Sequence, residues 1–175
     1  MITQLDFNIL NFIQDNLSNG FTDTVMKFIT HLGDYGALWI ITAIAMLCFK
    51  KTRKAGFCLA ISLALTAIIG NVILKNLFAR TRPFIAANVP IIINAPSGFS
   101  FPSGHTSSSF AAATALSLHY KKYAVIFYIV AALIGFSRIY LYVHYPSDVV
   151  AGAILGVVVA IASCKLTKNY KKTLH

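Results

Sequence analysis

The sequence contains no glutamate, and aspartate supplies all five of its acidic residues. Charged residues of both signs make up only 11% of the chain, whereas about 25% is typical of soluble globular domains. Hydrophobic residues reach 57%. These proportions exclude an ordinary soluble domain and indicate an integral membrane protein.

Cysteines are also scarce, and Cys48, Cys58 and Cys164 lie inside or at the ends of apolar runs without zinc-type spacing. We expect them to be small buried hydrophobic residues. The N-terminus has no basic region before its apolar stretch and no small-residue cleavage site after it, which argues against a signal peptide. Internal repeats, low-complexity tracts and linkers are absent too, so residues 1–175 are predicted to form one domain.

Long apolar runs dominate the chain. Since a membrane-spanning helix needs about 20 apolar residues, we expect five transmembrane helices, near residues 24–49, 55–79, 103–120, 122–141 and 147–166. The first is the least regular, because its first half carries Lys27, His31 and Asp34. We expect this helix to be kinked near Gly33 and Gly36 and to be partly hydrated at its outer end.

Residues 1–21 are too short and too polar to span a membrane. Four apolar side chains fall on one helical face, namely Leu5, Ile9, Phe12 and Ile13. This pattern predicts an amphipathic helix at the membrane interface. The expected fold is therefore an all-α integral membrane protein with five transmembrane helices and an N-terminal interfacial helix.

Basic residues predict the orientation. Ten of them form three clusters between or after the expected spans: Lys50, Lys51, Arg53 and Lys54; Lys121 and Lys122; and Lys165, Lys168, Lys171 and Lys172. Five spans would place all three clusters and the C-terminus on one side, which the positive-inside rule assigns to the cytoplasm. The net charge of +10 is then a topology signal that also attracts anionic lipid, and nucleic-acid binding is not expected.

Five basic residues lie outside these clusters: Lys27, Lys75, Arg80, Arg82 and Arg138. An ionisable side chain at membrane depth costs several kcal/mol unless it is paired or faces a hydrated cavity. Lys75 and Arg138 are therefore candidates for function. Arg80 is expected to extend to the interface, as long basic side chains do near helix ends.

The stretch "FPSGHTSSSF", residues 101–110, opens the third span on the outer face. Pro102 and Ser103 predict a helix start at which the serine hydroxyl can cap. Gly104 leaves the first backbone N–H groups accessible, and such groups bind anions. His105 would lie in the first turn, beside the bound anion.

The stretch "SRIYLYVHYPSDVVAG", residues 137–152, brings further polar groups to the same face. Arg138 precedes a short loop that carries His144, and Asp148 follows after Pro146 has restarted a helix. A carboxylate beside an imidazole can fix its tautomer and leave the other nitrogen free as a nucleophile or base.

Three segments carry a family resemblance: "KNLFARTRP" (75–83), "PSGH" (102–105) and "SRIYLYVHYPSD" (137–148). In order and spacing they resemble the signature motifs of the type 2 phosphatidic acid phosphatase superfamily, with every motif position filled by the expected residue. The chain is most similar to the small bacterial lipid phosphatases of that superfamily, which include undecaprenyl pyrophosphate and phosphatidylglycerophosphate phosphatases.

The resemblance implies roles for individual residues. His144 would attack phosphorus and form a phosphohistidine, while Asp148 holds its ring. His105 would protonate the leaving group and then activate the water that cleaves the intermediate. The phosphate oxygens would be bound by Lys75, Arg82, Arg138, the Ser103 hydroxyl and the Gly104 N–H.

No cofactor is expected. Phosphoryl transfer needs mainly positioning and charge stabilisation, which fixed cations supply. Three cations beside the two histidines would also repel Mg²⁺ or Zn²⁺. Because His144 must be neutral to attack and His105 protonated to donate, the activity should have a bell-shaped pH profile.

The expected substrate is a lipid phosphate or pyrophosphate that enters laterally from the outer leaflet of a bacterial inner or plasma membrane, with undecaprenyl pyrophosphate favoured. Phosphatidylglycerophosphate, phosphatidic acid and lipid A phosphates are alternatives, and so is phosphoryl transfer to another lipid. An anion transporter fits less well, because its charges would be spread through the depth of the bundle. The sequence leaves open the oligomeric state and whether loop 84–100, or His31 with Asp34, contacts the substrate.

Two further patterns carry expectations. Gly152 and Gly156 form a small-residue spacing that predicts helix packing within the monomer. Tyr140, Tyr142 and Tyr145 are expected to form an interfacial aromatic belt.

Overall fold

The computed structural model describes residues 2–172 of the chain and the side chains of residues 3–166. No strand occurs among these residues. The elements follow one another as α1 (Ile2–Leu17), α2 (Gly20–Leu32), η1 (Asp34–Gly36), α3 (Ala37–Cys48), α4 (Arg53–Ala67), η2 (Ile68–Leu74), α5 (Lys75–Phe78), α6 (Pro83–Ala86), α7 (Gly104–His119), η3 (Lys121–Tyr123), α8 (Ala124–Tyr140) and α9 (Pro146–Lys172).

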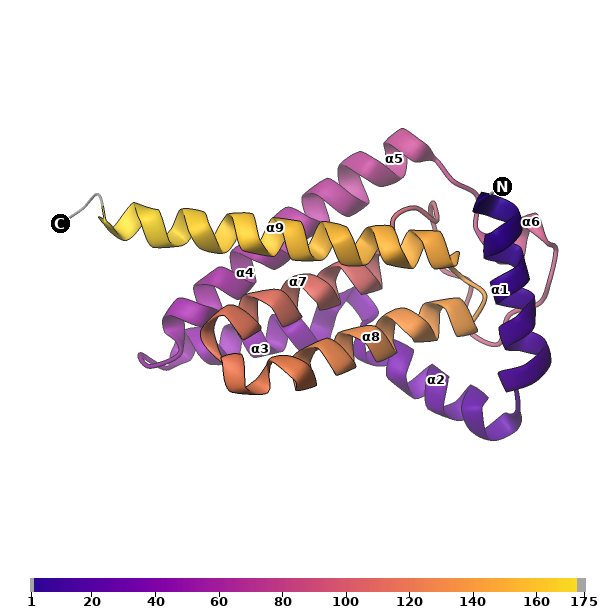
Figure 1. Cartoon of the computed structure of the whole chain (residues 1–175), viewed down its shortest axis with the longest axis horizontal. Coiled ribbons are helices and arrows are strands. Elements are labelled where there is room, and N and C mark those ends of the chain that lie inside the picture. The colour runs from indigo at the N-terminus through magenta and orange to yellow at the C-terminus, as the bar shows by residue number, and fades with distance from the viewer. Residues whose placement is uncertain (1, 173–175) are drawn as a thin grey trace.

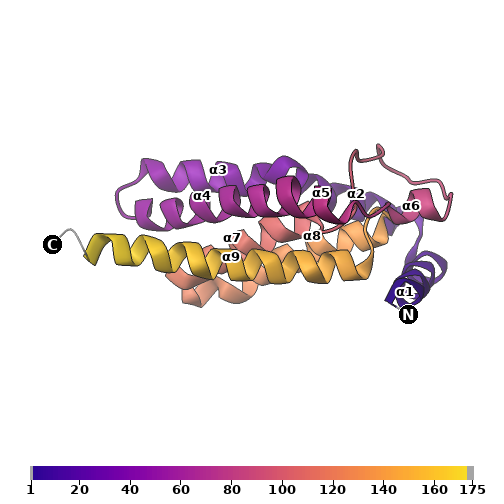
Figure 2. The same ribbon diagram turned by 90° about the horizontal axis from the view of Figure 1, so that it is seen from above.

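Helices α3, α4, α7, α8 and α9 run side by side along the long axis of the molecule (Figure 1). α7 lies at the centre, in contact with α4, α8 and α9, and α3 packs along α4. In the view from above, the α3–α4 pair runs alongside α9 (Figure 2). α7 is therefore the element around which the other helices are arranged.

Small residues let α9 approach α7 closely. A Cβ atom added at Gly152 would lie 2.8 Å from the backbone oxygen of Ser103, and one added at Gly156 would collide with the backbone oxygen of Ser107. The expectation that these glycines serve packing within the monomer is confirmed. On α7, the hydroxyls of Ser107 and Ser108 donate to carbonyls of their own turn, which keeps these polar side chains satisfied inside the bundle.

Four helical segments are long and apolar enough to cross a membrane: Gly20–Cys48, Arg53–Ala86, Lys121–Tyr140 and Pro146–Leu166. These agree with four of the five expected spans. α7 has only 16 residues, so its crossing of the membrane, and with it the fifth span, stays a prediction. The first span is interrupted at η1, where Tyr35 and Gly36 take positive φ angles, as the expected kink near Gly33 and Gly36 requires.

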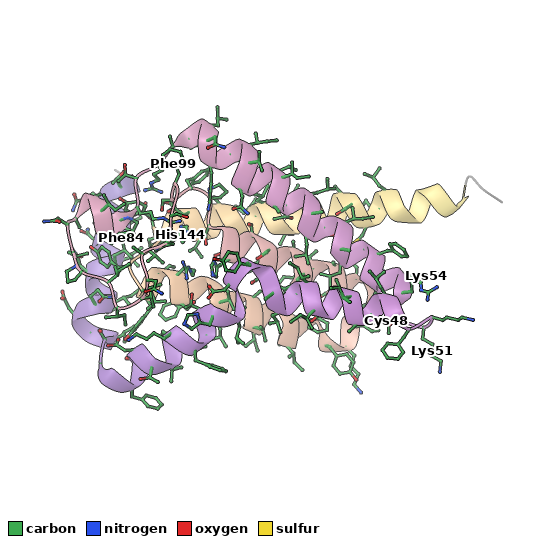
Figure 3. The ribbon with its side chains drawn as sticks, turned by 180° about the vertical axis from the view of Figure 1, so that it is seen from behind. Cys48, Lys51, Lys54, Phe84, Phe99 and His144 are labelled. Carbon is green, nitrogen blue, oxygen red and sulfur yellow. A yellow bond between two sulfur atoms is a disulfide. The ribbon has the colours of Figure 1, made fainter. Side chains whose placement is uncertain are left out.

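The basic clusters gather at one end of the bundle. The α3–α4 loop, the α7–α8 turn and the C-terminal part of α9 share that end in Figure 1, and Figure 3 places Lys51 and Lys54 there. His144, Phe84 and Phe99 lie at the opposite end (Figure 3). The expected separation of basic clusters from candidate site is therefore confirmed, whereas the side of the membrane that each end faces stays a prediction.

Helix α1 crosses the end of the bundle opposite the basic clusters (Figure 1). Leu5 and Phe12 are each 61% exposed and leave an apolar face available to lipid, as expected. Ile13 was assigned to that face but is buried, together with Leu10, against the turn that follows α8. α1 is thus apolar on two sides, one of which packs against the protein.

The expectation that all three cysteines are small buried hydrophobic residues is wrong. Cys58 of α4 and Cys164 of α9 are buried but joined by a disulfide, and Cys48 is exposed. The pairing does not follow from local sequence, because the two bonded residues are 106 positions apart.

The three tyrosines expected in an interfacial belt are also buried, at 2%, 6% and 3% exposure for Tyr140, Tyr142 and Tyr145. The Tyr140 hydroxyl donates to Asp23 of α2, and that of Tyr142 donates to Asn11 of α1. The two N-terminal helices cover these tyrosines, so they hold the end of the bundle together instead of facing the membrane.

Candidate active site

A cavity of about 1150 Å³ opens at the end of the bundle that carries His144. Six of the eight predicted site residues line it: Lys75, Arg82, Gly104, His105, Arg138 and His144. The other two, Ser103 and Asp148, are fully buried behind this lining. The structure therefore gathers three motifs that are far apart in the sequence around one space.

His144 lies in the tight turn between α8 and α9 and is only 2% exposed. Its Nε2 atom is 3.2 Å from a terminal nitrogen of Arg82, and its Nδ1 atom is 3.6 Å from Oδ2 of Asp148. Because a guanidinium group only donates hydrogen bonds, Nε2 must carry the lone pair. The ring proton then lies on Nδ1, on the side of Asp148.

The environment of His144 keeps its ring neutral. Burial and the neighbouring cations Arg138 and Arg82 lower the pKa of His144 to about 3, although Asp148 acts in the opposite direction. At neutral pH the imidazole is therefore unprotonated at Nε2 and can act as a nucleophile, as the sequence analysis requires.

Asp148 lies in the first turn of α9, which begins at Pro146 as predicted. Its Oδ2 atom accepts hydrogen bonds from the Ser100 hydroxyl at 2.5 Å and from the backbone N–H of Tyr145 at 3.0 Å. Its contact with His144 is longer than a hydrogen bond. The carboxylate is thus held firmly by other groups next to the imidazole, and Ser100 is a site residue that the sequence analysis missed.

Arg80 contradicts its expected role at the interface. It donates to Asp148 Oδ1 at 2.5 Å, to the Ser147 hydroxyl at 2.7 Å and to Asp6 of α1 at 2.8 Å. Its guanidinium also lies 3.8 Å from the centre of the Tyr145 ring. Asp148 and Asp6 are far from Arg80 in the sequence, but their buried carboxylates hold its side chain against the protein.

Arg82 is 3% exposed and donates to the backbone carbonyls of Ser97, Gly98 and Val143. It thereby attaches loop 84–100 to the turn that carries His144. In this position it presents one terminal nitrogen to the imidazole.

Arg138 and Lys75 supply the other two predicted cations. Arg138 is 3% exposed and donates to the Thr30 hydroxyl, but its Nε atom has no hydrogen-bond partner among the described residues. Lys75 directly follows η2, a π-helical segment of the kind that often occurs at functional sites. An anion in the cavity would satisfy the unpaired donor of Arg138.

The start of α7 presents its backbone to the cavity. Ser103 occupies the N-cap position as predicted, but its hydroxyl accepts from Thr106 and makes no capping hydrogen bond. A Cβ atom at Gly104 would lie 2.8 Å from Oδ1 of Asn71, so a larger residue would have to displace the Asn71 side chain. The buried Ser103 hydroxyl therefore does not reach the cavity, whereas Gly104 lines it.

His105 lies in the first turn of α7 and its Nε2 atom is 2.9 Å from Oδ1 of Asp34. The other oxygen of Asp34 is 2.7 Å from Nδ1 of His31. All three side chains line the cavity. The possible entrance residues His31 and Asp34 are thus part of the site itself.

Away from the charged end, the cavity wall is mainly apolar. Loop 84–100 contributes its segment from Ile92 to Ser97, and α3 and α4 contribute Ile40, Ile44, Leu47, Leu63 and Ala64. The cavity therefore joins a cluster of cations and histidines to a hydrocarbon-like surface between two helices.

The chain is similar to proteins of a known superfamily. The sequence profile of the PAP2 superfamily matches residues 55–172, which include all three motifs. An undecaprenyl-diphosphatase from Sulfolobus acidocaldarius is 34% identical over 163 residues, which cover 91% of this chain and 76% of that protein.

Solved structures agree. The crystal structure of Aquifex aeolicus LpxE has a TM-score of 0.78 and 31% identity, covering 92% of this chain and 95% of that one. A transmembrane PAP2 type phosphatidylglycerolphosphate phosphatase from Bacillus subtilis has a TM-score of 0.76 and 26% identity, covering 99% and 88%. With the histidines and cations of the three motifs gathered in one cavity, these matches establish that the chain belongs to the PAP2 superfamily and is a membrane phosphatase.

Proposed function

We propose that the protein hydrolyses a lipid phosphate or pyrophosphate through a phosphohistidine on His144, without a metal ion, and that it converts undecaprenyl pyrophosphate to undecaprenyl phosphate. The observation that carries this proposal is the position of the buried His144 imidazole between Arg82 and Asp148. Its unprotonated Nε2 faces Arg82 at the charged end of a cavity whose remaining wall is apolar.

In the first step, Nε2 of His144 attacks phosphorus in line, and the bond from phosphorus to the leaving oxygen breaks. His105 gives a proton to that oxygen. Lys75, Arg82, Arg138 and the backbone N–H of Gly104 bind the non-bridging oxygens, whose charge they stabilise in the transition state. Asp148 stabilises the positive charge that develops on the imidazole.

In the second step, water attacks the phosphohistidine. His105, now neutral, takes a proton from the water, and the bond between phosphorus and Nε2 breaks. Inorganic phosphate leaves, and both histidines return to their starting states. The overall reaction consumes one water and needs no other reactant.

The apolar wall supports a lipid substrate. Ile40, Ile44 and Leu63 would contact a hydrocarbon chain while its phosphate lies among the cations. The undecaprenyl-diphosphatase from Sulfolobus acidocaldarius, which matches along most of the chain, supports a polyprenyl pyrophosphate. Phosphatidylglycerophosphate is the second candidate, because the Bacillus subtilis neighbour covers nearly the whole chain.

The positive-inside rule supports an extracytoplasmic site. The basic clusters lie at the end of the bundle opposite His144, so a cytoplasmic C-terminus places the cavity at the outer leaflet. This orientation requires that α7 crosses the membrane as the third of five spans in a single domain.

Phosphate release in detergent with EDTA tests the proposal. The substrates are undecaprenyl pyrophosphate, phosphatidylglycerophosphate, phosphatidic acid and a lipid A phosphate, and the variants are His144→Ala and, as a control, His119→Ala at the far end of α7. We expect EDTA-resistant phosphate release that is fastest with undecaprenyl pyrophosphate. His144→Ala should abolish this release, and His119→Ala should retain it.

Unchanged release in His144→Ala would refute the role of His144 as the nucleophile. Faster release from a phospholipid than from undecaprenyl pyrophosphate would refute the polyprenyl substrate. A competing lipid alcohol that becomes phosphorylated would identify transfer instead of hydrolysis.

A further inference from the structure

The structure contains a second histidine–carboxylate pair, in the lining of the same cavity as His144. Oδ1 of Asp34 is 2.9 Å from Nε2 of His105, and Oδ2 is 2.7 Å from Nδ1 of His31. A carboxylate only accepts hydrogen bonds, so each facing ring nitrogen carries a proton. None of the three sequence motifs contains Asp34.

The interruption between α2 and α3 places Asp34 beside His105. Asp34 begins η1 directly after Gly33, which is buried. A Cβ atom at Gly33 would lie 2.6 Å from Cδ2 of His105 and 2.8 Å from a methyl carbon of Ile134. The imidazole therefore packs directly on the backbone of the turn, an approach that only glycine permits.

The charges around His105 make this carboxylate important. Arg138 of α8 and Lys75 of α5 line the same cavity and repel a further positive charge. His31 of α2 adds to this repulsion whenever it is protonated. Asp34 of η1 is the only acidic residue that lines the cavity among the described residues, and its charge favours the imidazolium form that a proton donor needs.

We propose that Asp34 is the positioning residue for His105, holding its ring through Nε2 and stabilising its protonated form. The proposal rests on the proposed function, in which His105 is the proton donor. Because Asp34 occupies Nε2, the proton that reaches the leaving oxygen comes from Nδ1. His105 keeps its Nε2 proton throughout, and Nδ1 recovers a proton from the water of the second step.

His31 has a supporting place in this arrangement. Its side chain is 67% exposed, so its hydrogen bond to Asp34 is made in contact with water and contributes little. It restrains the second carboxylate oxygen, whereas Asp34 itself makes the contact with the proton donor.

Dependence on the leaving group tests the proposal. An alkyl phosphate needs its leaving oxygen protonated, whereas para-nitrophenyl phosphate releases a stable phenolate without a proton. We expect Asp34→Asn to reduce the rate with dodecyl phosphate about tenfold more than the rate with para-nitrophenyl phosphate. Only dodecyl phosphate needs a proton from His105 in the first step, whereas any effect on the second step is common to both substrates. His105→Gln should show the same selectivity to a larger degree. The double variant should be no slower than His105→Gln alone, because the two residues act as one unit.

Two further variants serve as controls. Asp15→Asn removes an exposed carboxylate of α1 that does not line the cavity and should leave both rates unchanged. Asp34→Glu keeps the negative charge and should recover much of the rate with dodecyl phosphate, which separates a loss of charge from a folding defect.

Comparison of Asp34→Asn with His105→Gln separates an error about Asp34 from an error about the proposed function. Equal losses with both substrates in Asp34→Asn, or no loss, while His105→Gln remains selective, would overturn the role of Asp34 alone. Full activity of His105→Gln on both substrates would instead overturn the proposed role of His105. Additive losses in the double variant would show that Asp34 acts independently of His105.

Discussion

Arg80 and Asp148 form an ion pair of 2.5 Å, and the same guanidinium also binds Asp6 of α1. Asp6 accepts two more hydrogen bonds, from the backbone N–H and the hydroxyl of Ser147. The carboxylate beside His144 is therefore connected to the helix that crosses the end of the bundle. α1 contributes to the site through this contact, although none of its described side chains lines the cavity.

Loss of the Arg80 side chain should lower both activity and stability. In Arg80→Gln, Asp148 loses its cationic partner and keeps only its hydrogen bonds from Ser100 and Tyr145. The carboxylate is then held less firmly beside His144, so we expect kcat to fall by about tenfold or more. Removing one partner of a buried pair costs about 3–5 kcal/mol, and this partly exposed pair should cost less. Steady-state rates and thermal unfolding in detergent measure both effects.

Asp6→Asn should give a smaller loss of kcat than Arg80→Gln, because Asp148 keeps its arginine. Arg53→Gln at the opposite end of the bundle is the matched control and should keep wild-type activity. Equal activity of wild type and Arg80→Gln would contradict the structural link to Asp148.

The low pKa of His144 predicts how stability depends on pH. The folded protein holds this imidazole neutral down to about pH 3, whereas the unfolded chain binds a proton below its ordinary pKa of about 6.5. Unfolding therefore takes up a proton in this range, and stability falls as the pH drops below about 6.5, by up to about 1.4 kcal/mol per pH unit from this group.

His144→Gln has no ring to protonate. Between about pH 7 and about pH 5, its unfolding temperature should fall less than that of the wild type. Thermal unfolding at a series of pH values in one detergent measures the difference. A parallel decrease in the two proteins would show that His144 titrates in the folded state as it does in the unfolded chain.

The sequence predicted which residues form the site better than it predicted the contacts that these residues make. Hydropathy located four spans. The three motifs placed His144, His105 and the three candidate phosphate-binding cations at one end of the bundle, because helix length and short turns restrict where such groups can lie. The kink between α2 and α3 followed from its glycines.

Long-range pairing was not predictable in the same way. Arg80 looks like an interfacial arginine in its local segment, and only the fold brings it to Asp6 and Asp148. The disulfide between Cys58 and Cys164 and the pairing of Asp34 with His105 have the same origin. Such contacts join residues on different helices, and periodicity within one helix carries no information about them.

Asn71 and Gly104 should behave as a coupled pair. Alanine at position 104 would place a methyl group 2.8 Å from the Asn71 side-chain oxygen, so it must displace either Asn71 or the first turn of α7. We expect Gly104→Ala to lower kcat/KM by about tenfold, since overpacking shifts the backbone N–H that we propose binds phosphate. Asn71→Ala makes room, so the double variant should be more active than Gly104→Ala alone. Losses that simply add would show that the two positions do not contact each other.

The contact of α9 with α7 should be the most sensitive packing interface of the bundle. A Cβ atom at Gly156 collides with the α7 backbone, while one at Gly152 meets Ser103 and Thr106, both close to the start of the helix that presents Gly104 and His105. Gly156→Ala should lower stability by about 1–3 kcal/mol, as overpacking of a filled interior does. Gly152→Ala should in addition reduce activity, because the added methyl group displaces the first turn of α7.

Gly20→Ala, where nothing lies within 4 Å of the new atom, is the control and should leave both the unfolding temperature and the rate of phosphate release unchanged. If Gly156→Ala unfolds at the same temperature as Gly20→Ala, the two helices do not pack as closely as the structure places them.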